Sequence, residues 1–150
     1  MQTDQHKFSL EIASKPSNIS EVEIFLTEVN KTLKLDEVHF HKLLVSATEA
    51  VNNDIVHGNK SDPNKQVVLT CIIKKRYLIL SVREAGDGFD PDSIPNPLND
   101  ENLLKESGRG MFLMKTLMDE VEIHTDDNGC EVLMSMYIGP QTGLKEEVEL

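Results

Sequence analysis

Along the first third of the chain, the spacing of apolar residues predicts a strand followed by a helix. Between His6 and Ala13, apolar side chains occupy every second position, as in a strand with one buried face. Ser20 and Glu23 have the spacing of a capping box that opens a helix through about Leu33. The apolar stripe of this helix comprises Val22, Leu26, Val29 and Leu33.

A second, longer helix is predicted from Asp36, which is placed to cap it, to about His57. Its apolar residues are spaced by four, three, four and four positions, which indicates one buried stripe. This stripe comprises Phe40, Leu44, Ala47, Val51 and Ile55. Gly58-Asn59 ends the helix with residues that tolerate a left-handed backbone.

The second half of the chain predicts paired strands on either side of a long irregular segment. Residues 65–74 and 77–83 are rich in β-branched and aliphatic side chains and predict a hairpin that turns at Lys75-Arg76. The segment from Gly86 to Gly108 contains three prolines and lacks periodicity, so we expect a functional loop there. A helix over 111–118 and a hairpin of 120–125 with 130–138, turning at Asn128-Gly129, complete the pattern.

The order β-α-α-β-β-loop-α-β-β predicts an α+β fold. We expect a two-layer sandwich whose mixed, mostly antiparallel sheet carries helices on one face. The 150 residues fit one domain over 1–150, with an ordered core over about 6–138 and a frayed polar tail.

Composition narrows the class of protein. The formal net charge of -11 gives the chain no electrostatic attraction to nucleic acids or to an anionic membrane surface. No apolar run approaches the ~20 residues that cross a bilayer, and the N-terminus lacks the apolar stretch of a secretory signal. Cys71 and Cys130 are isolated in the sequence, so a reduced cytoplasmic protein is the simplest interpretation.

Polar residues of the second predicted helix form the first candidate site. Glu49, Asn53 and His57 recur every four residues, share one face and lie roughly opposite the apolar stripe. A solvated helix face would show the same spacing. The Asn52-Asn53 pair is unusual inside a helix, because asparagine side chains compete for backbone hydrogen bonds. A carboxylate one turn before an amide oxygen suits a water or a hydrated Mg²⁺, an ion that prefers oxygen ligands.

Two glycine-containing segments border the long loop. Glu84-Ala85-Gly86-Asp87-Gly88 follows a predicted strand, and its glycines either admit a flat ligand or make a tight turn. Ser107-Gly108-Arg109-Gly110 comes directly before a predicted helix, where unpaired N–H groups form an anion site. Arg109 adds a charged fork suited to phosphate, although a glycine hinge with a solvent-facing arginine is the alternative.

Together these segments resemble the GHKL ATPases, the superfamily of gyrase, heat-shock chaperones, histidine kinases and MutL. Within that superfamily the chain most resembles the anti-sigma-factor serine kinases. The matching segments are Thr48–Asn53, His57–Asn59, Gly86–Pro91, Ser107–Met114 and Leu117–Val121. The resemblance covers nearly the whole chain, from the first strand to Ile138, and implies the histidine-kinase-like ATPase fold.

The resemblance also implies a role for each matching residue. Asn53 would ligate an Mg²⁺ ion that bridges the ATP phosphates, and Glu49 would be the catalytic residue that orients or deprotonates the nucleophile. Glu84 would accept a hydrogen bond from the adenine amino group, in a pocket shaped by Gly86 and Gly88. The remaining nucleotide-binding positions would be Gly108, Arg109 and Gly110, which hold the phosphates, together with Met111 and Cys130.

The implied activity is that of a serine protein kinase in a partner-switching circuit. In this family the γ-phosphoryl group of ATP passes to a serine of an anti-sigma-factor antagonist, and the kinase, as a homodimer, also sequesters a sigma factor. Residues 89–107 would form the lid over ATP.

Two positions depart from the family pattern, which has Asp where this chain has Glu84 and usually Thr where it has Cys130. The alternative is therefore a non-catalytic regulatory module that binds a protein partner and senses nucleotide or binds none. A histidine-kinase catalytic domain fits less well, because the chain has no room for a helix pair carrying a phosphoacceptor histidine.

Overall fold

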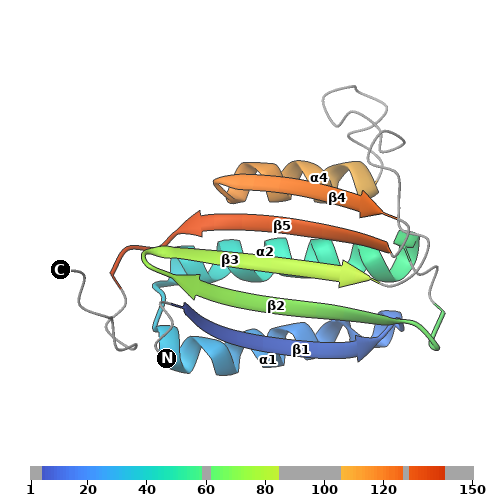
Figure 1. Cartoon of the computed structure of the whole chain (residues 1–150), viewed down its shortest axis with the longest axis horizontal. Coiled ribbons are helices and arrows are strands. Elements are labelled where there is room, and N and C mark those ends of the chain that lie inside the picture. The colour runs from blue at the N-terminus through green and yellow to red at the C-terminus, as the bar shows by residue number, and fades with distance from the viewer. Residues whose placement is uncertain (1–4, 59–61, 85–105, 127–128, 141–150) are drawn as a thin grey trace.

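The computed structural model describes residues 5–58, 62–84, 106–126 and 129–140. They form a sandwich in which helices cover one face of a five-stranded sheet (Figure 1). The elements are β1 (Gln5–Ala13), η1 (Pro16–Asn18), α1 (Ile19–Leu33), α2 (Glu37–Asn53), η2 (Asp54–Gly58), β2 (Gln66–Lys74), β3 (Tyr77–Glu84), α4 (Glu106–Leu117), β4 (Glu120–Asp126) and β5 (Gly129–Tyr137). The predicted element order and the α+β class are confirmed.

The strands lie in the order β1-β2-β3-β5-β4, and every described pairing is antiparallel. β3 and β4 run in the same direction, but β5 lies between them (Figure 1). The described part of the sheet therefore contains no parallel pair, where the sequence had left room for a mixed sheet.

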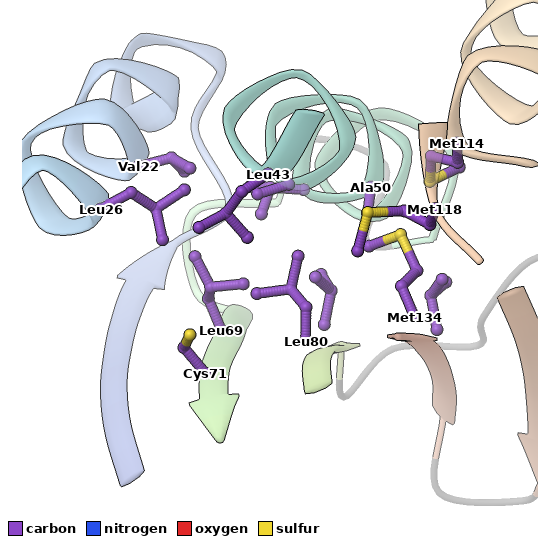
Figure 2. Close-up of a cluster of buried hydrophobic side chains, with 14 of the residues drawn as sticks. Val22, Leu26, Leu43, Ala50, Leu69, Cys71, Leu80, Met114, Met118 and Met134 are labelled. Carbon is purple, nitrogen blue, oxygen red and sulfur yellow. The ribbon is translucent and has the colours of Figure 1, made fainter. Parts of the chain in front are cut away.

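The core lies between the sheet and the helices. Alternate residues of β2 point toward the helices and are buried, as a strand with one covered face requires. Leu69, Leu80 and Met134 of the sheet lie on the side that faces Leu26 and Leu43 of the helices (Figure 2). The predicted stripe of α1 is confirmed, because Val22, Leu26, Val29 and Leu33 are all buried.

The capping box predicted for α1 is wrong. The helix begins at Ile19 after Asn18, and neither Ser20 nor Asn18 caps it with a side chain; Ser20 Oγ instead donates to the Ser17 carbonyl at 3.3 Å. A 3-10 turn, η1, leads directly into the helix and supplies backbone hydrogen bonds at the entrance. The predicted cap of α2 is correct, since Asp36 Oδ1 accepts the backbone N–H of His39 at 2.8 Å.

The buried face of α2 is broader than the predicted stripe and rotated from it. Ala47, Val51 and Ile55 are fully buried as predicted. Phe40 and Leu44, however, are only partly buried, whereas Leu43 and Ala50, outside the predicted stripe, are fully buried. The reason is that α2 is the central helix and contacts α1, α4 and β3, so it buries more than one narrow stripe.

Both predicted hairpins are present, but the third helix begins earlier than expected. Lys75 turns the β2–β3 hairpin with a φ of 58°, and Gly129 opens β5 with a φ of 137°, while Asn128 lies outside the described residues. α4 begins at Glu106 rather than near Met111, so Ser107–Gly110 form its first turns instead of a loop before it. Packing of α4 against α2 outweighs the poor helix propensity of two glycines. No helix among the described residues is long and apolar enough to cross a membrane.

Candidate functional site

Several chain segments that are distant in sequence meet at one end of the sandwich. α2 ends there at Asn53, β3 ends there at Glu84, and both β5 and α4 begin there (Figure 1). Glu84 pairs across the sheet with Cys130, η2 contacts β3, and α2 packs along α4. The fold thus gathers the polar residues that the sequence singled out from three separate regions.

Glu49 lies against the first turns of α4. A Cβ atom added to Gly110 would come within 2.5 Å of Glu49 Oε2 and 3.4 Å of its Cδ, so only glycine permits this approach. Gly110 itself is buried, and Glu49 is half-buried. The Glu49 carboxylate is therefore held near the start of a helix, where the backbone carries partial positive charge.

Asn53 is buried, with 5% of its surface exposed, although it lies one turn beyond Glu49 on the same helix. The interpretation of Glu49 and Asn53 as a solvated face opposite the apolar stripe is therefore wrong for Asn53. Directly after Asn53 the chain continues as η2, which contacts β3.

Glu84 and Asp54 bring two carboxyl groups together inside the protein. Glu84 is 1% exposed and Asp54 is fully buried. Burial, followed by the charge of Glu84, raises the pKa of Asp54 well above its ordinary value. No described residue forms a hydrogen bond with either carboxyl oxygen of Asp54. Buried polar groups without partners are rare, so this one calls for an explanation.

Asp54 is a residue that the sequence reasoning missed. It opens η2, a π-type turn, and such turns occur frequently at functional sites. The sequence does contain a pattern that indicates burial of Asp54, because Leu43, Ala47, Ala50 and Asp54 follow one another at intervals of four, three and four residues. This helical spacing places Asp54 on the face of α2 that packs most deeply.

Cys130 is fully buried beside Glu84, and a neighbouring strand provides a hydroxyl group close to it. Thr125 Oγ1 lies 3.8 Å from Cys130 Sγ, within range of a weak hydrogen bond. Both cysteines are free and buried, and desolvation raises the pKa of the Cys71 thiol to about 12. Neither thiol forms a disulfide.

The remaining predicted site residues fall into three groups. Gly108 and Arg109 lie in the first turn of α4, where N–H groups lacking helical partners offer an anion site. Met111 is 3% exposed and belongs to the hydrophobic core. Gly86 and Gly88, together with most of the predicted lid, lie outside the described residues.

The arrangement suits phosphate chemistry with a divalent ion. The Glu49 carboxylate lies against the first turns of α4, and the buried Asn53 follows it one turn later on α2. A carboxylate such as Glu49 could act as a base, an amide oxygen such as that of Asn53 is a ligand of the kind that Mg²⁺ prefers, and the start of a helix offers donors for phosphate oxygens. Among the described residues, no group of three His, Cys, Asp or Glu side chains is placed to hold a metal ion by itself.

Comparison with known proteins agrees with this geometry. Residues 12–136 match the histidine kinase-like ATPase domain family. The chain is 33% identical to an anti-sigma F factor of Geobacillus thermodenitrificans, over 82% of this chain and 84% of that protein. It is 30% identical to an anti-sigma F factor of Oceanobacillus iheyensis, over 89% and 94%. The serine-protein kinase RsbW of Bacillus subtilis is 26% identical over 92% and 89%.

A solved structure shows the same fold. The crystal structure of the RsbU and RsbW domains of a Mycobacterium tuberculosis protein superposes with a TM-score of 0.67 at 14% identity. The match covers 91% of this chain and 33% of that longer one. The chain belongs to the histidine kinase-like ATPase domain family, in the branch that contains the anti-sigma-factor kinases.

Proposed function

We propose that this protein is an anti-sigma-factor-type serine kinase that binds Mg·ATP at the end of the sandwich where α2, β3 and α4 meet. The observation that carries the proposal is the contact between Glu49 and Gly110. It sets a carboxylate against the helix start that would hold the transferred phosphate, one turn from the buried amide of Asn53.

Each residue of the proposed site has a separate role in phosphoryl transfer. Glu49 orients the serine hydroxyl of the substrate and takes its proton as the oxygen attacks the γ-phosphorus. Gly108, Arg109 and Gly110 bind the phosphates at the start of α4. Glu84 accepts a hydrogen bond from the adenine amino group. Mg²⁺, held through Asn53 and the phosphates, would neutralise negative charge on the phosphate oxygens.

Names of the relatives supply the proposed partners. Two relatives are anti-sigma F factors and one is the serine-protein kinase RsbW. We therefore assign a sigma factor as the bound partner and a serine of an anti-sigma-factor antagonist as the phosphate acceptor. Binding takes place in the cytoplasm, with the kinase as a homodimer.

One observation favours a second function, that of a regulatory module that binds a protein without catalysis. Two buried carboxyl groups, Asp54 and Glu84, lie in the proposed base-binding region, and their side chains occupy space there. If the pair excludes the base, partner binding would be independent of ATP.

Calorimetric titration with Mg·ATP separates the two functions. The kinase requires saturable binding, followed by transfer of ³²P from γ-labelled ATP to a serine of the purified antagonist. Glu49→Gln should keep the affinity for Mg·ATP and lower the transfer rate by about 10²–10⁴-fold.

Glu37→Gln is the matched control. It makes the same change on the same helix at an exposed position, 12 residues or about 18 Å from Glu49, and should transfer phosphate at the normal rate. A wild-type protein that binds no Mg·ATP would refute the kinase and leave the binding module. A Glu49→Gln variant of normal activity would exclude Glu49 as the base.

A further inference from the structure

Asp54 is the one buried charged group of the described chain for which the proposed mechanism has no use. Its side chain is fully enclosed, and neither of its carboxyl oxygens has a hydrogen-bond partner among the described residues. A buried polar group without a partner costs free energy, so the fold carries a penalty at this position. Binding residues are often kept at such a cost, because the ligand supplies the missing partner.

The position of Asp54 indicates which part of a ligand it would meet. It follows Asn53 directly and lies close enough to Glu84 for the two carboxyl groups to interact electrostatically. The cross-strand neighbours of Glu84, Val67 and Cys130, are both fully buried. The carboxyl groups of Asp54 and Glu84 thus offer two hydrogen-bond acceptors among apolar neighbours. Such a place suits a neutral group with two N–H donors better than a hydrated cation, because burying a charge costs more free energy.

We propose that Asp54 is a second base-recognising residue, which accepts one N–H of the adenine amino group while Glu84 accepts the other. The exocyclic amino group of adenine carries two N–H donors, and a single carboxyl at position 84 need satisfy only one of them. A carboxyl group has an oxygen able to accept an N–H whether or not it holds a proton. This inference rests on the proposed binding of ATP and adds a specificity determinant to it.

The test compares two nucleotides that differ only in that amino group. ATP and purine riboside 5′-triphosphate, which has hydrogen in place of the amino group, are titrated into wild-type protein, Asp54→Ala and Asp54→Asn. We expect Asp54→Ala to weaken ATP binding about tenfold and to leave the affinity for purine riboside triphosphate unchanged. Asp54→Asn retains an acceptor oxygen of the same reach and should bind ATP within about threefold of wild type.

Ser46→Ala is the matched control. The Ser46 hydroxyl is also buried and lacks a hydrogen-bond partner among the described residues, but it lies eight residues earlier on α2, about 12 Å away. Removing it should leave both affinities unchanged.

Other results of these titrations would contradict the inference or the proposed function. Equal weakening of both nucleotides by Asp54→Ala, or no weakening of either, would show that Asp54 does not contact the amino group. The same change of selectivity in Ser46→Ala would also contradict the inference, because it would reflect a general effect of the core. If wild type binds neither nucleotide, the proposed function itself fails.

Discussion

At the scale of single residues, Asp54 shows how the interior changes an ordinary side chain. Burial and the neighbouring Glu84 disfavour its charged form and raise its pKa well above 3.8. The unfolded chain releases this proton near pH 4, whereas the folded protein keeps it to higher pH. The unfolded state therefore binds fewer protons over that range, and the contribution of Asp54 to stability falls as the pH rises.

Replacing Asp54 by Asn removes this titration. The variant should become progressively more stable than wild type as the pH rises above about 4, by up to about 1.4 kcal/mol per pH unit. The difference should stop growing once the pH passes the pKa of the folded protein. Urea unfolding of both proteins between pH 4 and 8 measures it, and parallel stability profiles would contradict the raised pKa.

Asp36 provides a control of opposite sign. Its pKa is lowered, first by the backbone hydrogen bond from His39, so the stability it contributes is present above its unfolded pKa and is lost as the pH falls. The free energy difference between Asp36→Asn and wild type should therefore stay constant above about pH 5, where the unfolded chain is also fully ionised at this position.

At the scale of elements, the contact between α2 and α4 decides where the proposed base lies. Gly110 brings the start of α4 against the Glu49 carboxylate, and the two helices pack along each other. The same glycine is proposed to bind phosphate through its backbone, whereas its lack of a side chain makes room for Glu49.

Gly110→Ala should impair catalysis more than folding. The new Cβ would meet the flexible end of Glu49, which can move aside, and Ala favours a helix over Gly by about 1 kcal/mol. We expect the free energy of unfolding to change by less than about 1 kcal/mol, and the transfer rate to fall by about 10²-fold because the carboxylate is displaced.

A double variant distinguishes displacement of Glu49 from other causes. In the Glu49→Gln background, Gly110→Ala should lower the transfer rate little further, since the base is already lost. Multiplicative losses in the double variant would show that Gly110 acts independently of Glu49.

The rotation of the buried face of α2 can be tested with two adjacent leucines. Leu43 is fully buried, whereas Leu44 is only partly buried. Leu43→Ala should cost about 2–5 kcal/mol of unfolding free energy, and Leu44→Ala clearly less. If urea denaturation showed a larger loss of unfolding free energy for Leu44→Ala than for Leu43→Ala, the buried stripe predicted from the sequence would be the correct one.

At the scale of the whole molecule, the candidate site joins segments that depend on the complete fold. The end of α2, the end of β3 and the start of α4 come together only when the sheet and the helices have packed. A ligand that binds there therefore binds the native state and stabilises all of it.

Mg·ATP should raise the melting temperature of the protein. At a concentration one hundred times its dissociation constant, the native state gains about 2.7 kcal/mol, which corresponds to about 5–10 °C for a chain of this size. Thermal unfolding with and without Mg·ATP measures the shift. Asn53→Ala should give a smaller shift, because the proposed metal ligand is missing, and an equal shift would exclude Asn53 from the site.

The sequence by itself determined the elements and their order. The two hairpins, the stripe of α1 and the cap at Asp36 all follow from local rules, because strand alternation, helical period and turn chemistry act over a few residues. Resemblance to a family supplied the proposed roles of Glu49, Asn53 and Glu84, and the fold brings the segments that carry them to one end of the molecule.

Only the tertiary structure decided which polar residues are enclosed. Asn53 is buried at the end of α2, Asp54 is buried where η2 packs against β3, and α4 begins as early as Glu106, where it packs against α2. These features depend on contacts between segments far apart in the chain. The spacing of apolar residues within one helix or strand carries no information about such contacts. The capping box at Ser20 failed because the 3-10 turn leads into a helix that already begins at Ile19, so Ser20 lies inside the first turn and not at the N-cap.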